Sequence, residues 1–152
     1  MTTLLNDTAD REITVSRLLD APIDLIWELW TNPDHIKNWW GPNGFTNTII
    51  KMDLIPGGEW TLIMHGPDGT NYDNESIFTE VEKHKKIAYN HISGHEFTAT
   101  IQFEVKGKQT HIHWQMLFET KEELRRIMNL FNINEGLKQN VDRLEVYLNQ
   151  LK

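Results

Sequence analysis

Histidines have the widest chemical scope of any side chain in this sequence, because imidazole can act as an acid, a base or a metal ligand. His111 and His113 alternate along a predicted strand and therefore share one of its faces. The predicted strand register turns that face outward beside Glu104. We therefore expect a solvated surface there, with neither a metal nor another cofactor.

A second pair, His91 and His95, straddles a predicted turn. Alternation with Ile87 and Tyr89 predicts that His91 lies on the inner face of its strand. A buried imidazole could serve as an acid or base, which makes His91 the candidate catalytic residue. A histidine that is only hydrogen-bonded at a strand end is the simpler interpretation. No catalytic or nucleotide-binding motif accompanies it, so an enzymatic activity is left open.

Composition limits the classes of function. The 152 residues include no cysteine, which excludes disulfides and thiolate chemistry and suits the cytoplasm. The formal net charge of -7 argues against nucleic-acid binding, and no apolar run is long enough for membrane insertion. We expect one domain over residues 1–152, with a flexible N-terminal segment over residues 1–10.

The last third of the sequence gives the clearest structural prediction. A two-residue turn at Gly107-Lys108 would pair Phe103 with Ile112 and Phe97 with Phe118, so that one face is apolar. The opposite face is polar throughout. Residues 132–152 then form a helix with one apolar stripe, which needs a partner surface. Its members are Leu137, Val141, Leu144, Leu148 and Leu151.

Apolar alternation, prolines and turn residues predict the other elements. Thr120 with Glu123, and Asn132 with Glu135, match capping boxes and predict a short helix followed by the long one. Further strands are predicted over 11–19, 46–54, 59–65, 71–81 and 86–91, and short helices over 22–31 and 33–39. In the fourth strand, either a bulge shifts the register or both faces are partly covered.

These elements predict an α+β domain in which an antiparallel sheet packs on the final helix. If the sheet curves, a cavity forms between the two. Six tryptophans suit an apolar pocket, although a loop carrying Trp39 and Trp40 could equally plug the core. The candidate ligand-binding residues are Trp39, Trp40, Trp60, Met64, Tyr89, His91, Phe97, Phe103, Trp114, Met116 and Asn140.

Several stretches spread over nearly the whole chain resemble the START-like (SRPBCC, Bet v 1-like) superfamily, and within it the proteins related to the C-terminal domain of the activator of Hsp90 ATPase. They are Ala21-Pro22 with Trp27, the block from Asn38 to Phe45, Pro56 to Trp60, Met64 to Gly69, Gly136-Leu137 and Asp142-Arg143-Leu144. The resemblance implies a helix-grip fold: a curved seven-stranded antiparallel sheet wrapped around the long C-terminal helix, with two short helices between the first two strands.

Three functions follow from this resemblance and from the pattern of residues. The first is binding of a small apolar or amphipathic ligand in the cavity. The second is catalysis there, of the cyclase, dehydratase or hydrolase kind. The third is contact with an Hsp90-type chaperone, as a co-chaperone or stress-related interaction module. The sequence fits a monomer or a homodimer equally well.

Overall fold

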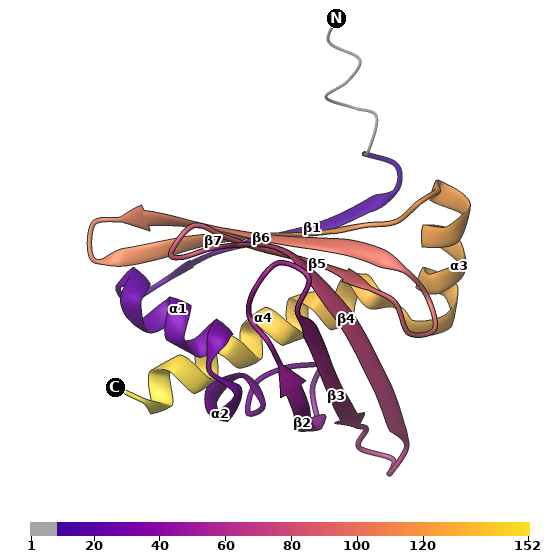
Figure 1. Ribbon diagram of the computed structural model, residues 1–152, viewed down its shortest axis with the longest axis horizontal. Coiled ribbons are helices and arrows are strands. Elements are labelled where there is room, and N and C mark those ends of the chain that lie inside the picture. Colours follow the sequence, from indigo (N-terminus) through magenta and orange to yellow (C-terminus); the bar gives the residue numbers. More distant parts are fainter. Residues whose placement is uncertain (1–8) are drawn as a thin grey trace, which may run out of the picture.

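The computed structural model describes residues 9–152 and contains a single seven-stranded sheet in which every neighbouring pair is antiparallel (Figure 1). The strand order is β1-β7-β6-β5-β4-β3-β2, so that β1 and β2 form the two edges. The strands are β1 (Glu12–Leu19), β2 (Thr46–Met52), β3 (Glu59–His65), β4 (Asn71–Glu82), β5 (Lys86–His91), β6 (Phe97–Lys106) and β7 (Gln109–Leu117).

The four helices of residues 9–152 lie on one side of this sheet or at its end, and α4 runs along its concave side (Figure 1). Two of them, α1 (Ile23–Thr31) and α2 (Pro33–Ile36), carry the chain from one edge strand to the other. The other two, α3 (Lys121–Phe131) and α4 (Ile133–Gln150), follow β7. This arrangement confirms the predicted helix-grip fold, although α2 ends at Ile36 and turns continue the chain to Trp39.

The register predicted for the last hairpin is confirmed. Gly107 has a φ of 64° in the two-residue turn, and Phe103 lies opposite Ile112. The ladder ends at the pair Thr98 and Leu117, so Phe118 lies just beyond it and does not pair with Phe97. Sorting the apolar and polar residues onto opposite faces was therefore enough to fix this register.

Bulges interrupt the pairing of the sheet at two places. The register shifts between Ile49 and Lys51 in β2 and between Phe78 and Glu80 in β4. The second bulge explains the irregular pattern of β4, and its inner face carries Tyr72, Asn74, Ser76 and Phe78 opposite residues of β3 and β5. Because a bulge bends its strand and increases the local twist, both shifts favour a curved sheet.

The break between α3 and α4 lies where the sequence predicts it, but the predicted cap is wrong. Thr120 caps α3 by accepting a hydrogen bond from the Glu123 backbone N–H, as expected. Asn132 has φ 48° and ψ 57° and makes no side-chain cap for α4. Instead, it ends α3 in the left-handed conformation, which asparagine tolerates better than most residues.

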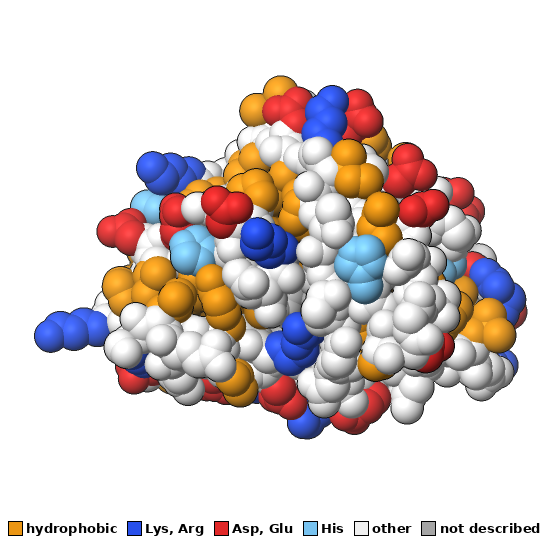
Figure 2. Space-filling view, turned by 90° about the horizontal axis from the view of Figure 1, so that it is seen from below, with side chains coloured by type: hydrophobic (Ala, Val, Ile, Leu, Met, Phe, Trp, Pro, Cys, Tyr) orange, Lys and Arg blue, Asp and Glu red, His pale blue; other side chains and the backbone are white. Residues whose placement is uncertain are grey.

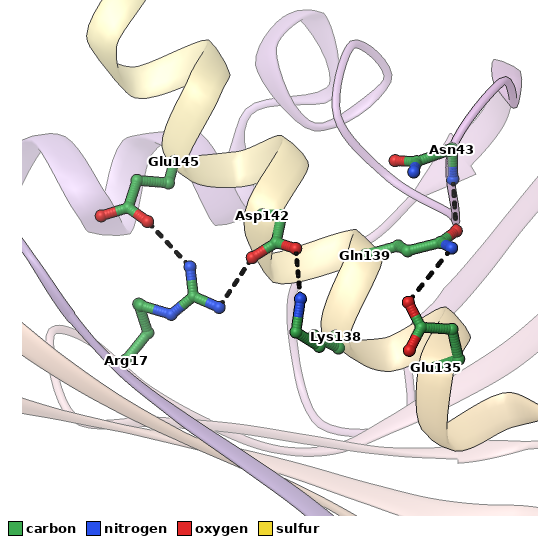
Figure 3. A network of polar contacts seen from close by, with 7 residues as sticks. All are labelled: Arg17, Asn43, Glu135, Lys138, Gln139, Asp142 and Glu145. Atoms are coloured by element: carbon green, nitrogen blue, oxygen red, sulfur yellow. Dashed lines mark hydrogen bonds and ion pairs between the residues drawn. The ribbon is translucent and has the colours of Figure 1, made fainter.

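The apolar stripe of α4 packs on the sheet through Val141, Leu144 and Leu148, each of which is fully buried. Leu151 lies beyond the end of the helix and is exposed, so it does not extend the stripe. At the edge of the sheet, the Arg17 guanidinium of β1 contacts Asp142 at 2.8 Å and Glu145 at 2.7 Å (Figure 3). These ion pairs connect α4 to an edge strand.

None of the helices in the described part of the chain combines the length and the apolar character that crossing a bilayer would require. Residues 1–8, most of the segment predicted to be flexible, lie outside the described residues.

The packing of α4 predicts that alanine substitutions at two nearby positions lower the free energy of unfolding by very different amounts. Leu144→Ala removes a fully buried side chain and should lower the free energy of unfolding by about 2 to 5 kcal/mol. Val146→Ala, on the exposed side of the same helix, should change it by less than about 0.5 kcal/mol. Chemical denaturation measures both, and equal effects would contradict this packing.

Candidate functional site

A pocket of about 660 Å³ lies between the inner face of the sheet and the N-terminal half of α4. Its wall combines strand residues with the loop that follows α2 and the junction of α3 and α4. Tyr72 and Phe131 line it and are 41% and 56% exposed, so the pocket opens to solvent beside them. The remaining lining residues are Trp40, Gly41, Pro42, Phe45, Met64, Asn71, Asp73, Asn74, Tyr89, His91, Ser93, Gly94, His95, Phe97, Trp114, Met116, Ile133, Gly136, Leu137 and Asn140.

The loop after α2 contributes both to the core and to the pocket. Trp39 is fully buried and donates its indole N–H to the Leu29 carbonyl. Trp40 lines the pocket and stacks on Trp114, with ring centroids 5.3 Å apart. The two interpretations of this aromatic loop therefore apply to neighbouring residues: one ring plugs the core, and the next forms part of the pocket wall.

Arg143 on α4 holds this loop in place. Its guanidinium donates hydrogen bonds to the backbone carbonyls of Trp40, Gly41 and Pro42 at 2.9–3.0 Å through one nitrogen. The other nitrogen reaches the carbonyls of Asn38 and Phe45. Burial lowers the pKa of Arg143, and the carbonyl dipoles offset the loss of water around its charge.

Further polar contacts between α4 and the loop reinforce this attachment. Asn140 donates its side-chain N–H to the Trp39 carbonyl at 2.9 Å. Figure 3 shows Gln139 accepting a hydrogen bond from the Asn43 backbone N–H while donating one to Glu135. The loop and the helix thus form one wall, although they lie far apart in the sequence.

His91 lies at the end of β5, is 5% exposed, and lines the pocket. Its Nδ1 is 2.7 Å from the His95 carbonyl oxygen, and its ring stacks on Phe97 with centroids 4.6 Å apart. Burial lowers the pKa of His91 to about 4, so the ring is neutral near pH 7. Because a carbonyl only accepts hydrogen bonds, Nδ1 carries the proton and Nε2 is an acceptor.

The remaining predicted site residues divide between the pocket and the core behind it. Met64, Tyr89, Phe97, Trp114, Met116 and Asn140 line the pocket together with Trp40 and His91. Three others, Trp39, Trp60 and Phe103, are buried in the core and do not line it. They pack against aromatic neighbours edge to face, as Trp60 does against Trp40.

Sequence reasoning missed Arg143 and Phe131. The sequence shows Arg143 only as a polar residue beside the apolar stripe of its helix, and its carbonyl partners leave no signal in side-chain types. The exposed Phe131 ends α3. An aromatic residue at the end of a segment rich in charged residues was the one signal in the sequence.

His95 lines the pocket beside His91, whereas the histidines of the other strands lie away from it. His111 pairs with Glu104 and His113 with Gln102 in the β6–β7 ladder, on the outer face as predicted. His113 contacts the Ser16 hydroxyl at 2.8 Å, and His65 contacts Thr48 and Asn71. Within residues 9–152, no group of three or more histidine or acidic side chains is placed to hold a metal ion.

The fold and the pocket are those of a helix-grip protein. Residues 20–149 match the family model described as activator of Hsp90 ATPase homolog 1-like protein, and the chain therefore belongs to that family. A search of the curated proteins gives no significant match.

Solved structures from several bacteria share this fold. A protein from Nitrosomonas europaea is 25% identical, with a TM-score of 0.84 over 93% of this chain and 96% of its own. One from Arthrobacter aurescens is 22% identical, with a TM-score of 0.87 over 95% and 89% of the two chains. An AHSA1-like protein from Aeromonas hydrophila is 21% identical, with a TM-score of 0.73 over 92% and 93%.

The buried His91 predicts a specific dependence of stability on pH. Its folded pKa of about 4 lies below the ordinary value of 6.5, so the unfolded state binds the proton more readily as pH falls. The stabilising contribution of neutral His91 is therefore complete above pH 6.5 and decreases as the pH falls toward the folded pKa of about 4. Between about pH 7 and about pH 5, the wild type should lose about 2 kcal/mol more than His91→Phe. Urea denaturation at both pH values tests this, and parallel losses would contradict it.

Because Arg143 holds the loop after α2, removing its side chain should destabilise that loop in particular. Arg143→Ala should lower the free energy of unfolding by about 1 to 3 kcal/mol, because it leaves several partly buried carbonyls without a donor. Amide hydrogen exchange in residues 38–45 should become faster. The control is Arg125→Ala, which removes an exposed arginine of α3. Unchanged exchange in the loop would show that the guanidinium does not hold it.

Proposed function

We propose that this protein binds a small apolar or amphipathic molecule in the pocket between the sheet and α4. A volume of about 660 Å³ is within the range of small-molecule sites, about 300 to 1,000 Å³. Its lining includes seven aromatic side chains and two methionines, which suit an apolar ligand. On the outside, Figure 2 shows the hydrophobic side chains of one face divided into separate groups by polar and charged ones.

The observation that carries this proposal is the open space beneath the start of α4. Gly136 lines the pocket, and a Cβ atom added there would meet only the Cβ of Pro42, at 4.0 Å. Farther along the same helix, Val141 and Leu144 are fully buried against the sheet. The helix is therefore tightly packed at its C-terminal half and stands over empty volume at its N-terminal half.

Catalysis in the same pocket is a second candidate, and the stacked rings of His91 and His95 are the feature that favours it. Their centroids are 5.2 Å apart, and burial lowers the pKa of both groups. A neutral His91 whose Nδ1 binds a backbone carbonyl is a weak base with one free acceptor nitrogen. It would suit positioning a substrate better than removing a proton from it.

Filling the pocket from Gly136 tests the binding function. Gly136→Phe should place a ring in the open volume and lower affinity for the neutral fluorophore N-phenylnaphthylamine by at least about tenfold. Gly136→Ala is the matched control, since its small side chain leaves the volume open. Both variants should be as stable as the wild type or more so, because glycine inside a helix costs about 1 kcal/mol relative to alanine.

Fluorescence titration measures the affinities, and chemical denaturation confirms that the variants are folded. If the wild type and a stable Gly136→Phe variant bound the probe with equal affinity, the probe would not bind in this pocket. The proposal would also fail if the wild-type protein bound no apolar probe.

A further inference from the structure

The charges around the pocket restrict what its occupant can be, an inference that rests on the proposed binding function. Among residues 9–152, the lining includes no lysine or arginine, and its one carboxylate is that of Asp73, an exposed residue. The nearest buried cation described above, Arg143, directs its guanidinium at backbone carbonyls. Burial and the nearby Arg126 lower the pKa of His95, and the charge of Arg126 is paired with Glu123 at 2.6 Å. A carboxylate or phosphate entering the pocket would therefore lose water without gaining an unpaired opposite charge.

One hydrogen-bond acceptor of the pocket has no partner among the described residues. His91 presents Nε2, which has no partner among the described residues, because its Nδ1–H is taken by the His95 carbonyl at 2.7 Å. The ring is 5% exposed and lines the pocket, so Nε2 is an acceptor that the fold leaves unpaired inside a mostly apolar wall. Such a group favours a ligand that donates to it.

Two amide side chains add to this acceptor character. Asn140 donates to the Trp39 carbonyl at 2.9 Å, and Asn74 donates to the Met64 sulfur at 3.2 Å. These contacts orient both amides, and within residues 9–152 nothing donates a hydrogen bond to either Oδ1 atom. Asn74 and His91 lie on β4 and β5, which are neighbouring strands, so their acceptors face the same part of the pocket.

The pocket also contains donors. The indole N–H of Trp114 has no partner among the described residues, but it is fully enclosed by protein atoms and cannot reach a ligand. The hydroxyls of Tyr72 and Tyr89 can donate, and each can equally accept. The asparagine amides each keep a second N–H and can also donate, so the preference rests on the unpaired Nε2 of His91, which can only accept.

We propose that the pocket selects an apolar ligand whose polar end donates hydrogen bonds, as an uncharged hydroxyl or an amine does, and that it rejects carboxylates. In this arrangement the ligand's apolar body lies among the aromatic rings, and its donor reaches Nε2 of His91. Asp73, near the mouth, adds an attraction for amines and a repulsion for anions.

A set of naphthalene derivatives with matched ring systems tests this selection. Displacement of N-phenylnaphthylamine from the wild-type protein would be measured for naphthol, naphthylmethylamine, naphthoate and unsubstituted naphthalene. Naphthol and naphthylmethylamine should each bind at least about tenfold more tightly than naphthoate. Naphthoate binding as tightly as naphthol would overturn the selection while leaving the binding function intact. Failure of all four compounds would overturn both.

A variant then locates the acceptor. His91→Phe keeps a flat ring beside Phe97 but removes Nε2, and it should reduce the ratio of naphthol affinity to naphthalene affinity by about tenfold. His111→Phe makes the same exchange on the outer face of β7 and should leave the ratio unchanged. An unchanged ratio in a folded His91→Phe variant would show that His91 does not receive the ligand's donor.

Discussion

The structure depends on one geometric constraint: a straight helix packs closely against a curved sheet over only part of its length. Leu144 and Leu148 are fully buried where α4 contacts the sheet. Toward its start the helix presents Gly136 and Asn140 to open volume instead. Because the bulges in β2 and β4 favour curvature, and α4 is pinned to β1 by Arg17, the gap is a consequence of the fold and does not need special residues to create it.

Polar contacts position the loop that forms one wall of the pocket. The loop after α2 places Trp40 and Phe45 on the pocket, and Arg143 holds that loop through backbone carbonyls. Since a guanidinium presents several donors in a fixed plane, it can bind carbonyls from successive residues, which a lysine ammonium cannot do in the same way. Gly41 contributes a φ of 95°, and a Cβ there would lie 2.9 Å from the Met64 methyl carbon, so the loop approaches β3 closely.

The sequence predicted those parts of the structure in which local pattern and burial agree. The β6–β7 register followed from sorting both faces at once, and the stripe of α4 followed from its period. The cap at Asn132 was wrong because the same side chain that can cap a helix also tolerates the left-handed backbone. Trp60 and Phe103 point inward as predicted, yet alternation cannot distinguish a ring in the core from a ring on a pocket wall. Arg143 could not be found because its partners are main-chain atoms.

The family assignment, the open volume and the unpaired Nε2 of His91 are the observations behind the proposed binding of a small molecule with a donor group. Native mass spectrometry of the protein purified from its own host tests this most directly. The account predicts a noncovalent adduct of small-molecule mass that dissociates on activation and carries a hydroxyl or amine. A bare protein mass under the gentlest conditions, from cells in which the protein is abundant, would contradict it.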